Sequence, residues 1–391
     1  MALEVHQLNY FLTEEQKMIQ DLARKAAQEL IAPVAAELDE KEEFPREILR
    51  QLAQADLFAV FYPVEYGGLG GGVFANCLVT EQLARACGGV AVSYAATGLG
   101  GTPILLMGSE EQKQKYLPLL ARGEKIGAFA LTEADAGSDA GNMRTTARKD
   151  GDYYVINGTK QWITNGGEAD IYTVIALTDP SRGVRGATAF IIEAGTPGFT
   201  YGKKEKKMGI RSSATRELVF QDCRVPKENV IAREGMGFIA ALKTLDMTRP
   251  GVGAQALGIA QGAFDHALKY SAERQQFGQA IINFQAIGHM LADMATQIEA
   301  ARLLVYATAR TIDSGAKEYG KEASMAKLFA SDVAMRVTTD AVQVAGGYGY
   351  MRDYPLEKYM RDAKITQIYE GTNQIQRNSI AAALAKEARR A

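Results

Sequence analysis

The sequence predicts an α+β fold that is mostly helical, with a small antiparallel β unit between two helical regions. Helical periodicity runs through residues 1–126, and short β-branched runs with a period of two occupy residues 127–234. Helical periodicity returns in residues 235–391. Strands and helices do not alternate, so a doubly wound parallel sheet is disfavoured. A chain of 391 residues is long enough for three packed units, and we expect domains with these three limits.

The N-terminal region carries a clear helix start. Thr13 followed by Gln16 forms a capping box, in which each side chain bonds the backbone of the other residue. Apolar residues then recur every four positions and predict one buried helix face: Leu22, Ala26, Leu30 and Val34. The glycine-rich residues 63–70 weakly resemble a dinucleotide loop. Because no β-branched strand precedes them, we expect an ordinary loop.

The middle region reads as short strands separated by turn signals. We expect strands near residues 153–156, 171–176, 189–192 and 217–220. Glycine-containing or proline-containing segments predict turns at residues 149–152, 157–158, 165–167 and 196–198. In the last region, apolar residues at helical spacing predict long helices over residues 284–313 and 320–344, and both lengths suit a bundle.

Composition excludes several classes of protein. The 44 basic and 46 acidic side chains give a net charge of -2, which offers no field for nucleic acid. Three cysteines without a CxxC pattern and three scattered histidines predict neither a disulfide framework nor a metal site. No targeting segment and no apolar run of about 18 residues is visible, so we expect a cytoplasmic protein without membrane insertion.

Two side chains stand out chemically, and the residues alone leave their roles open. The only tryptophan, Trp162, is by its type more often a core or rim residue than the wall of a cofactor site. Glu370 follows mostly apolar residues and precedes Gly371. Such a carboxylate is usually solvated, but burial would raise its pKa and make it a better base near neutrality. The sequence does not decide whether it is buried.

Three motifs in order resemble the acyl-CoA dehydrogenase family, and the likeness covers nearly the whole chain. Residues 130–139 read ALTEADAGSD, against the family pattern A-x-T-E-x-x-x-G-S-D. Residues 274–278 read RQQFG, the family's R-x-x-F-G, and are followed by Phe284 and Gln285. The third block joins QVAGGYG at 343–349, RDAK at 361–364 and YEGT at 369–372. The resemblance implies a C-terminal four-helix bundle.

The resemblance also implies FAD between the β domain and the bundle, with its adenine end reaching a neighbouring subunit of a homotetramer. Phe129, Leu131 and Thr132 would line the isoalloxazine, and Trp162 and Thr164 would pack beside it. Four residues would hold the pyrophosphate and adenine of FAD from the adjacent subunit: Arg274, Phe277, Gln343 and Gly347. Thr372 and Gln374 would complete the site from the C-terminal loop.

The reaction implied is α,β-dehydrogenation of an acyl-CoA thioester to the trans-2-enoyl-CoA. Glu370 would remove the α-proton while the β-hydride goes to flavin N5, and its backbone N–H would bond the thioester carbonyl together with a ribityl hydroxyl. Thr248 occupies the position that carries the base in some relatives, so Glu370 would act alone. The substrate-binding residues would be Ser138, Asp246, Arg249, Tyr369 and Gly371.

The acyl pocket would lie between residues 90–105, residues 245–252 and Tyr369. Glycines at 98, 100 and 101 would either leave room for a medium-length, branched or cyclic acyl group or simply allow tight helix packing. No arginine lies between Arg85 and Arg122, which disfavours a glutaryl-type substrate.

Other functions within and outside this enzyme class also remain open. Intact Glu370 argues against flavin monooxygenases, and the absence of an extra C-terminal region argues against acyl-CoA oxidases. Enoyl-CoA reduction, with an electron-transferring flavoprotein as donor, is an alternative to dehydrogenation with that protein as acceptor. A non-catalytic CoA-binding homologue would be expected to lack Glu370 or the Arg274/Phe277 pair, and all three are present.

Overall fold

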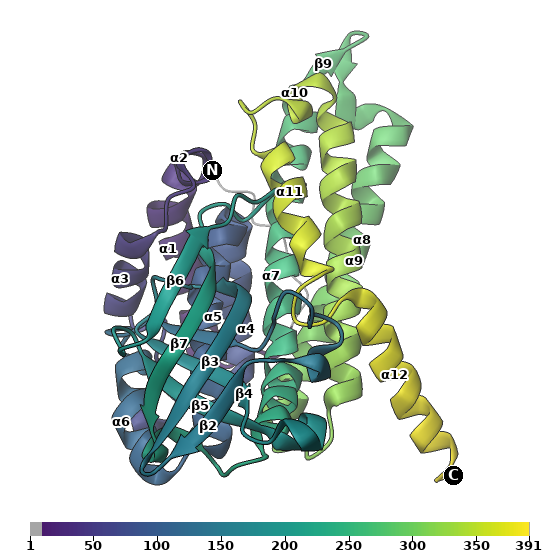
Figure 1. Ribbon diagram of the computed structural model, residues 1–391. Coiled ribbons are helices and arrows are strands. Elements are labelled where there is room, and N and C mark those ends of the chain that lie inside the picture. Colours follow the sequence, from purple (N-terminus) through teal and green to yellow (C-terminus); the bar gives the residue numbers. More distant parts are fainter. Residues whose placement is uncertain (1–9, 391) are drawn as a thin grey trace.

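The computed structural model describes residues 10–390, and the predicted fold class is confirmed. Helices come first, a β-sheet follows and helices end the chain, so that the sheet lies beside the N-terminal helices and the long C-terminal helices stand next to both (Figure 1). The domain limits given above remain a proposal.

The first N-terminal helix begins as predicted, and its predicted apolar face is correct in part: Ala26 is buried, and Leu30 and Val34 pack against the core. In α1 (Glu14–Ala26), the Gln16 backbone N–H donates to Thr13 Oγ1 at 3.2 Å, which confirms the capping box. Leu22 is 42% exposed. Besides Ala26, the buried apolar positions of this segment are Ile19, Ala23, Ala27 and Ile31. A strict four-residue repeat drifts around a helix of 3.6 residues per turn, and a π-helical turn at Ala27–Ile31 shifts the face further.

The rest of the N-terminal region packs around one apolar helix. Its other helices are α2 (Ala35–Lys41), α3 (Arg46–Gln54), α4 (Gly72–Ala86), α5 (Gly88–Met107) and α6 (Glu110–Ala121). Residues 63–70 form a short 3-10 turn and a loop, as predicted. Within residues 10–390, α5 is the one helix long and apolar enough to cross a membrane, and 67% of its most apolar window is buried inside the fold. Burial in the core accounts for that apolar composition.

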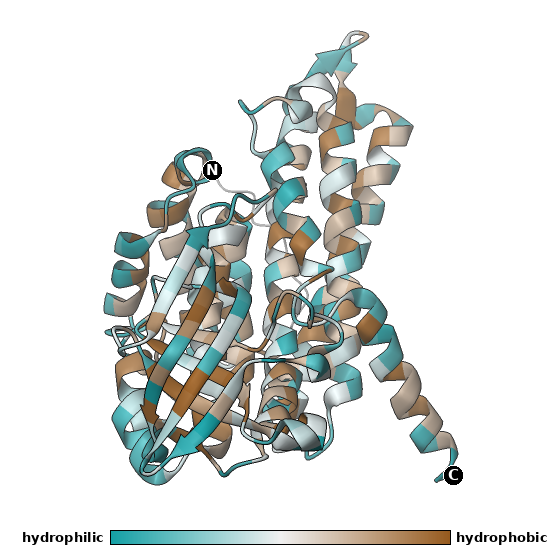
Figure 2. Cartoon of the chain, in the orientation of Figure 1, coloured by the Kyte–Doolittle hydropathy of each residue, from teal (hydrophilic) through white to brown (hydrophobic). Residues whose placement is uncertain are grey.

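The eight-stranded sheet has the order β6-β7-β3-β2-β4-β5-β8, with β1 pairing on β4. Its strands are β1 (Gly127–Ala130), β2 (Thr146–Asp150), β3 (Tyr153–Thr164), β4 (Ile171–Leu177), β5 (Ala187–Glu193), β6 (Phe199–Lys204), β7 (Thr215–Pro226) and β8 (Val230–Ile231). The pairing is mostly antiparallel as predicted, but β1 and β2 both pair in parallel with β4. Figure 2 shows hydrophobic and hydrophilic residues alternating along the strands.

One predicted turn is wrong. Asn157 and Gly158 lie inside β3, where the pairing with β7 shifts register. Asn157 bonds across to Asp222, and a Cβ on Gly158 would lie 2.7 Å from the Cα of Thr145. Gly158 therefore allows the chain to approach closely at a β-bulge, and it does not form a hairpin turn.

The C-terminal region is a bundle built on three long helices. These are α7 (Gly237–Glu273), α8 (Gln285–Asp313) and α9 (Gly320–Ala345), so both predicted helices are confirmed within one residue. The shorter α11 (Leu356–Thr366) packs on α7 and α9 as the fourth helix. The last helix, α12 (Asn373–Ala388), packs on α9 and then leads away from the bundle (Figure 1).

Candidate active site

A cavity of about 480 Å³ lies where α5, the sheet and α7 meet the loop between α11 and α12. Ten of the residues predicted for a cofactor or substrate line it: Phe129, Leu131, Thr132, Ser138, Trp162, Thr164, Arg249, Tyr369, Glu370 and Gly371. They come from segments up to about 240 positions apart in the sequence. Folding therefore brings residues of all three regions to one hollow.

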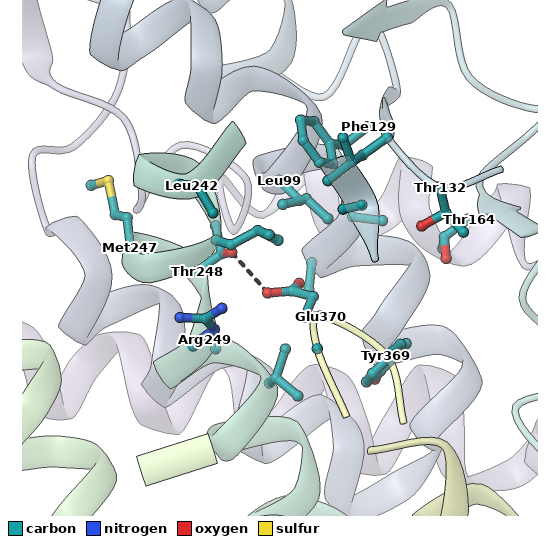
Figure 3. A pocket seen from close by; sticks show the side chains of 18 of the residues that line it. Leu99, Phe129, Thr132, Thr164, Leu242, Met247, Thr248, Arg249, Tyr369 and Glu370 are labelled. Carbon is teal, nitrogen blue, oxygen red and sulfur yellow. Dashed lines mark hydrogen bonds between the residues drawn. The ribbon is translucent and has the colours of Figure 1, made fainter. Parts of the chain in front are cut away.

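Glu370 occupies a strained position in this cavity. Its backbone has φ 51°, in the left-handed region that non-glycine residues seldom adopt, and Gly371 follows with φ 91°. Such strain costs on the order of 1–3 kcal/mol and persists only where the surroundings enforce it. The carboxylate points toward α7, where the Thr248 hydroxyl donates to Oε2 at 2.9 Å (Figure 3).

The environment of Glu370 raises its pKa. Burial has the largest effect, because it disfavours the charged carboxylate. The Thr248 hydrogen bond and the nearby cations Arg249 and Lys327 act in the opposite direction. The side chain is half-buried and faces the cavity, so the solvated-turn interpretation of this glutamate is wrong. A carboxylate with a raised pKa is a stronger base for proton abstraction.

Arg249 is buried beside Glu370 rather than on the helix surface. Only 6% of it is exposed, and its Nη1 bonds Asp246 at 2.6 Å. Its Nε has no hydrogen-bond partner within residues 10–390. Asp246 does not line the cavity and instead holds the guanidinium from behind. The arrangement leaves a donor of Arg249 for an acceptor that the protein does not supply.

The sheet side of the cavity offers a flat aromatic group and two threonine hydroxyls. Trp162 sits where β3 and β7 shift register, with φ 57°, and is 56% exposed. A bulge of this kind re-aims a side chain, here toward the cavity. Neither hydroxyl of Thr132 and Thr164 makes a hydrogen bond within the described residues, and both lie on this side in Figure 3. An aromatic wall with free donors fits a planar, acceptor-rich ring such as isoalloxazine.

Six predicted cofactor residues lie outside this cavity. The Arg274 guanidinium lies 5.5 Å from the Tyr348 ring centroid at the tip of the bundle, and Phe277, in the β9–β10 hairpin there, is 95% exposed. Gln343 ends α9, and Gly347 begins the short α10 (Gly347–Tyr350) at the same tip (Figure 1). Thr372 caps α12 by accepting from the Ile375 backbone N–H, and Gln374 is exposed. Within one chain these residues do not reach the cavity.

Sequence reasoning missed two polar residues at the site. Gln255 of α7 accepts a hydrogen bond from the Tyr369 hydroxyl and donates to the Gly88 carbonyl at 3.0 Å. Lys327 of α9 is fully buried and donates to the Gly371 carbonyl at 2.7 Å. Each polar side chain falls on the buried face of its helix, which was the available signal.

The α5 glycines have different roles. A Cβ on Gly100 would lie 2.5 Å from the Ala128 backbone nitrogen, and one on Gly101 would lie 2.5 Å from the Tyr62 hydroxyl oxygen. These two glycines serve tight packing. Gly98 lines the cavity, and the nearest atom to an added Cβ would be Phe61 Cδ1 at an ordinary 3.7 Å. Only Gly98 therefore leaves room in the cavity.

Within residues 10–390, no group of three or more histidine, cysteine, aspartate or glutamate side chains is placed to hold a metal ion.

Family models match almost the entire chain. The acyl-CoA dehydrogenase N-terminal domain matches residues 13–124, the middle domain residues 128–223 and the C-terminal domain residues 235–385. The short-chain-specific acyl-CoA dehydrogenase of Clostridium acetobutylicum is 50% identical over 371 residues, covering 95% of this chain and 98% of that protein. The NADH-dependent acryloyl-CoA reductase of Anaerotignum propionicum is 48% identical over 376 residues, covering 96% of this chain and 95% of that protein.

Solved structures agree. Butyryl-CoA dehydrogenase from Megasphaera elsdenii matches with a TM-score of 0.94 at 49% identity, covering 97% of this chain and 100% of that one. A chain in a structure of the electron transferring flavoprotein of Acidaminococcus fermentans matches with a TM-score of 0.94 at 52% identity, covering 96% and 99%. The FAD complex of an acyl-CoA dehydrogenase from Bacillus anthracis matches with a TM-score of 0.91 at 37% identity, covering 97% and 68%. The protein therefore belongs to the acyl-CoA dehydrogenase family of enzymes.

Proposed function

We propose that this enzyme uses FAD to convert an acyl-CoA thioester to the trans-2-enoyl-CoA, with Glu370 as the base that takes the α-proton. The observation that carries the proposal is the Glu370 carboxylate, which faces the cavity with a raised pKa and one hydrogen bond, from Thr248. A raised pKa makes the carboxylate a stronger base for this proton.

Glu370 also offers a second group to the substrate. Its backbone N–H makes no hydrogen bond within the described part of the chain. An α-proton of a thioester is weakly acidic, so its removal needs donors at the carbonyl oxygen where negative charge develops. We assign this N–H to the thioester carbonyl, so that one residue positions the substrate and deprotonates it.

The flavin site combines the cavity wall with the tip of a second subunit. Phe129, Leu131, Thr132, Trp162 and Thr164 would hold the ring. When bound, FAD supplies the acceptor for the hydride that leaves Cβ. Four other residues lie at the tip of the bundle, outside the cavity, which supports a contribution from a neighbouring subunit and a homotetramer: Arg274, Phe277, Gln343 and Gly347. Thr372 and Gln374, which follow Gly371 of the cavity wall, would complete the site from the C-terminal loop.

The substrate proposed is an acyl-CoA with a short acyl group. Relatives of about half identity are named short-chain-specific and butyryl-CoA enzymes. Ser138, Tyr369, Gly371 and Arg249, with Asp246 behind it, would bind the thioester and its CoA arm. Gly98 is the position that would admit branching or added length.

An electron-transferring flavoprotein is the proposed partner, because a chain 52% identical to this one occurs in a structure described by that name. The reverse reaction, enoyl-CoA reduction, is the second candidate, because the acryloyl-CoA reductase is 48% identical. A cytoplasmic location stays a prediction from the sequence.

The test is an anaerobic titration of the FAD-loaded enzyme with thioesters from butyryl-CoA to palmitoyl-CoA, including branched, cyclic and glutaryl forms. Bleaching of the flavin by short saturated thioesters would support dehydrogenation. If no saturated thioester bleaches the flavin but crotonyl-CoA reoxidises the reduced enzyme rapidly, the reductase function holds instead.

A further inference from the structure

A buried lysine stands behind the loop that carries Glu370. Lys327 lies in the middle of α9 with 0% of its surface exposed, and its neighbours on the same helix face are small: Ala323, Ser324, Ala330, Ser331 and Ala334. A buried ammonium is costly unless it is held by partners, and an apolar residue would fill this space at lower cost. Its presence therefore calls for a specific role.

The ammonium of Lys327 bonds both ends of the segment that follows the base. It donates to the Gly371 carbonyl at 2.7 Å and to Asn373 Oδ1 at 2.9 Å. Asn373 is itself fixed by donating to Ser331 Oγ at 2.9 Å and to Asp332 Oδ1 at 2.7 Å. Gly371 lines the cavity, whereas Lys327, Asn373 and Ser331 do not. These hydrogen bonds hold the peptide next to Glu370 in its strained, left-handed conformation.

The same ammonium acts on Glu370 by its charge. Lys327 and Glu370 each shift the other's pKa, because each favours the charged form of its partner. Burial nonetheless lowers the pKa of Lys327 to about 8, so the side chain remains mostly a cation at pH 7. No hydrogen bond joins Lys327 to the Glu370 carboxylate within residues 10–390, and the lysine bonds the Gly371 carbonyl and the Asn373 side chain instead.

Other charged groups face Lys327 and Glu370 from the helices packed around them. From α7 come Arg249, which lowers the pKa of Glu370, and its partner Asp246. Asp332 of α9 bonds Arg377 of α12 at 2.9 Å. Asp246 and Asp332 each have an arginine partner. Lys327 is therefore the α9 cation that acts on Glu370.

We propose that Lys327 is a positioning residue for catalysis: it clamps the Gly371–Asn373 backbone so that Glu370 faces the substrate, and its positive charge sets the proton affinity of the base. The inference rests on the proposed role of Glu370. A purely structural lysine would stabilise the loop without affecting the titration of the glutamate. The two roles therefore differ in a measurable quantity.

The test is an infrared pH titration of the Glu370 carboxyl band in FAD-loaded enzyme without substrate, with the band assigned by its absence in Glu370→Gln. Lys327→Met removes charge and donors, and Lys327→Gln keeps a donor but removes the charge. We expect the titration midpoint of Glu370 to move to higher pH in both variants. Turnover at pH 7 should fall about tenfold to a hundredfold, because small misplacements of a reacting group cost this much.

The matched control is Ser331→Ala, which removes a hydrogen bond to Asn373 and leaves every charge in place. It should speed amide hydrogen exchange in residues 370–373 and leave the midpoint of Glu370 unchanged. Lys327→Gln keeps the test decisive if Lys327→Met does not fold. A midpoint equal to that of the wild type in the folded charge-removing variant would overturn the proposal. Because no turnover enters the titration, failure of the proposed function would show separately, as an unbleached flavin.

Discussion

The chemistry of the site depends on how single residues favour the charged or the neutral form of the Glu370 carboxylate. Burial raises the pKa of Glu370, while Thr248, Arg249 and Lys327 favour its charged form. The result is a carboxylate that is neither fully solvated nor locked in an ion pair. Thr248 matters most directly, because it alone donates a hydrogen bond to the carboxylate within the described residues.

Thr248→Val tests this balance. Removing the hydroxyl removes a bond to the charged form, so the pKa of Glu370 rises further and less base is available at a given pH. The rising limb of kcat/KM against pH should move to higher pH. At a pH below that limb, kcat/KM should fall by about tenfold, the effect of one hydrogen bond to a charged group. Thr248→Ser, which keeps the hydroxyl, is the control. A limb that stays in place in Thr248→Val would contradict this account.

At the scale of elements, α5 packs against the sheet at one glycine and lines the cavity at another. Its Gly100 face meets the β1 backbone, while its Gly98 face opens to the cavity. One helix thus joins the sheet to the acyl pocket. Two glycines only two positions apart should respond in opposite ways to the same substitution.

Gly100→Ala should destabilise the protein by about 1–3 kcal/mol, since the added carbon would meet backbone atoms that cannot easily move. Gly98→Ala should leave stability equal or higher, because alanine favours a helix. It should also lower kcat/KM for the longest accepted acyl chain by about tenfold relative to butyryl-CoA. Thermal unfolding and a chain-length series measure the two effects. Equal loss of stability in both variants would refute the division of roles.

Some elements were predictable because their signals are local. The helices α8 and α9 carry regular apolar repeats, and the Thr13 capping box lies within four residues. The Asn157–Gly158 turn was mispredicted because the requirement for glycine comes from Thr145, which directly precedes the neighbouring strand β2. Long-range contacts also place Glu370 against Thr248 and Lys327 against Gly371. No short stretch of sequence contains those contacts. The family resemblance pointed to Glu370 but not to Lys327.

At the scale of the whole molecule, buried ion pairs join the regions that frame the site. Arg302 of α8 bonds Glu81 of α4 at 3.0 Å, with side-chain exposures of only 4% and 3%. Tyr306 donates to the same carboxylate at 2.6 Å, and Gln261 of α7 accepts from Arg302 at 2.7 Å. This network connects the N-terminal helices to the bundle.

Arg302→Met should therefore destabilise the protein by about 3–5 kcal/mol, because it leaves Glu81 charged, buried and without its arginine. Adding Glu81→Leu should restore part of the loss, since the uncompensated charge is gone. Arg50→Ala, which breaks the exposed pair with Glu47, should change stability by less than about 1 kcal/mol. Denaturant unfolding of the FAD-loaded enzyme measures all three. A double variant less stable than Arg302→Met would show that the cost does not arise from the buried charge.

The most direct measurement of the central claim is deuterium incorporation at Cα of butyryl-CoA, in heavy water without oxygen or an electron acceptor, followed by mass spectrometry. Wild-type enzyme and Glu370→Gln are compared after confirming that both hold FAD and bind the thioester equally. If Glu370 is the base, the wild type incorporates deuterium at Cα and the glutamine variant does not. Incorporation at the wild-type rate by Glu370→Gln would mean that another group removes the α-proton.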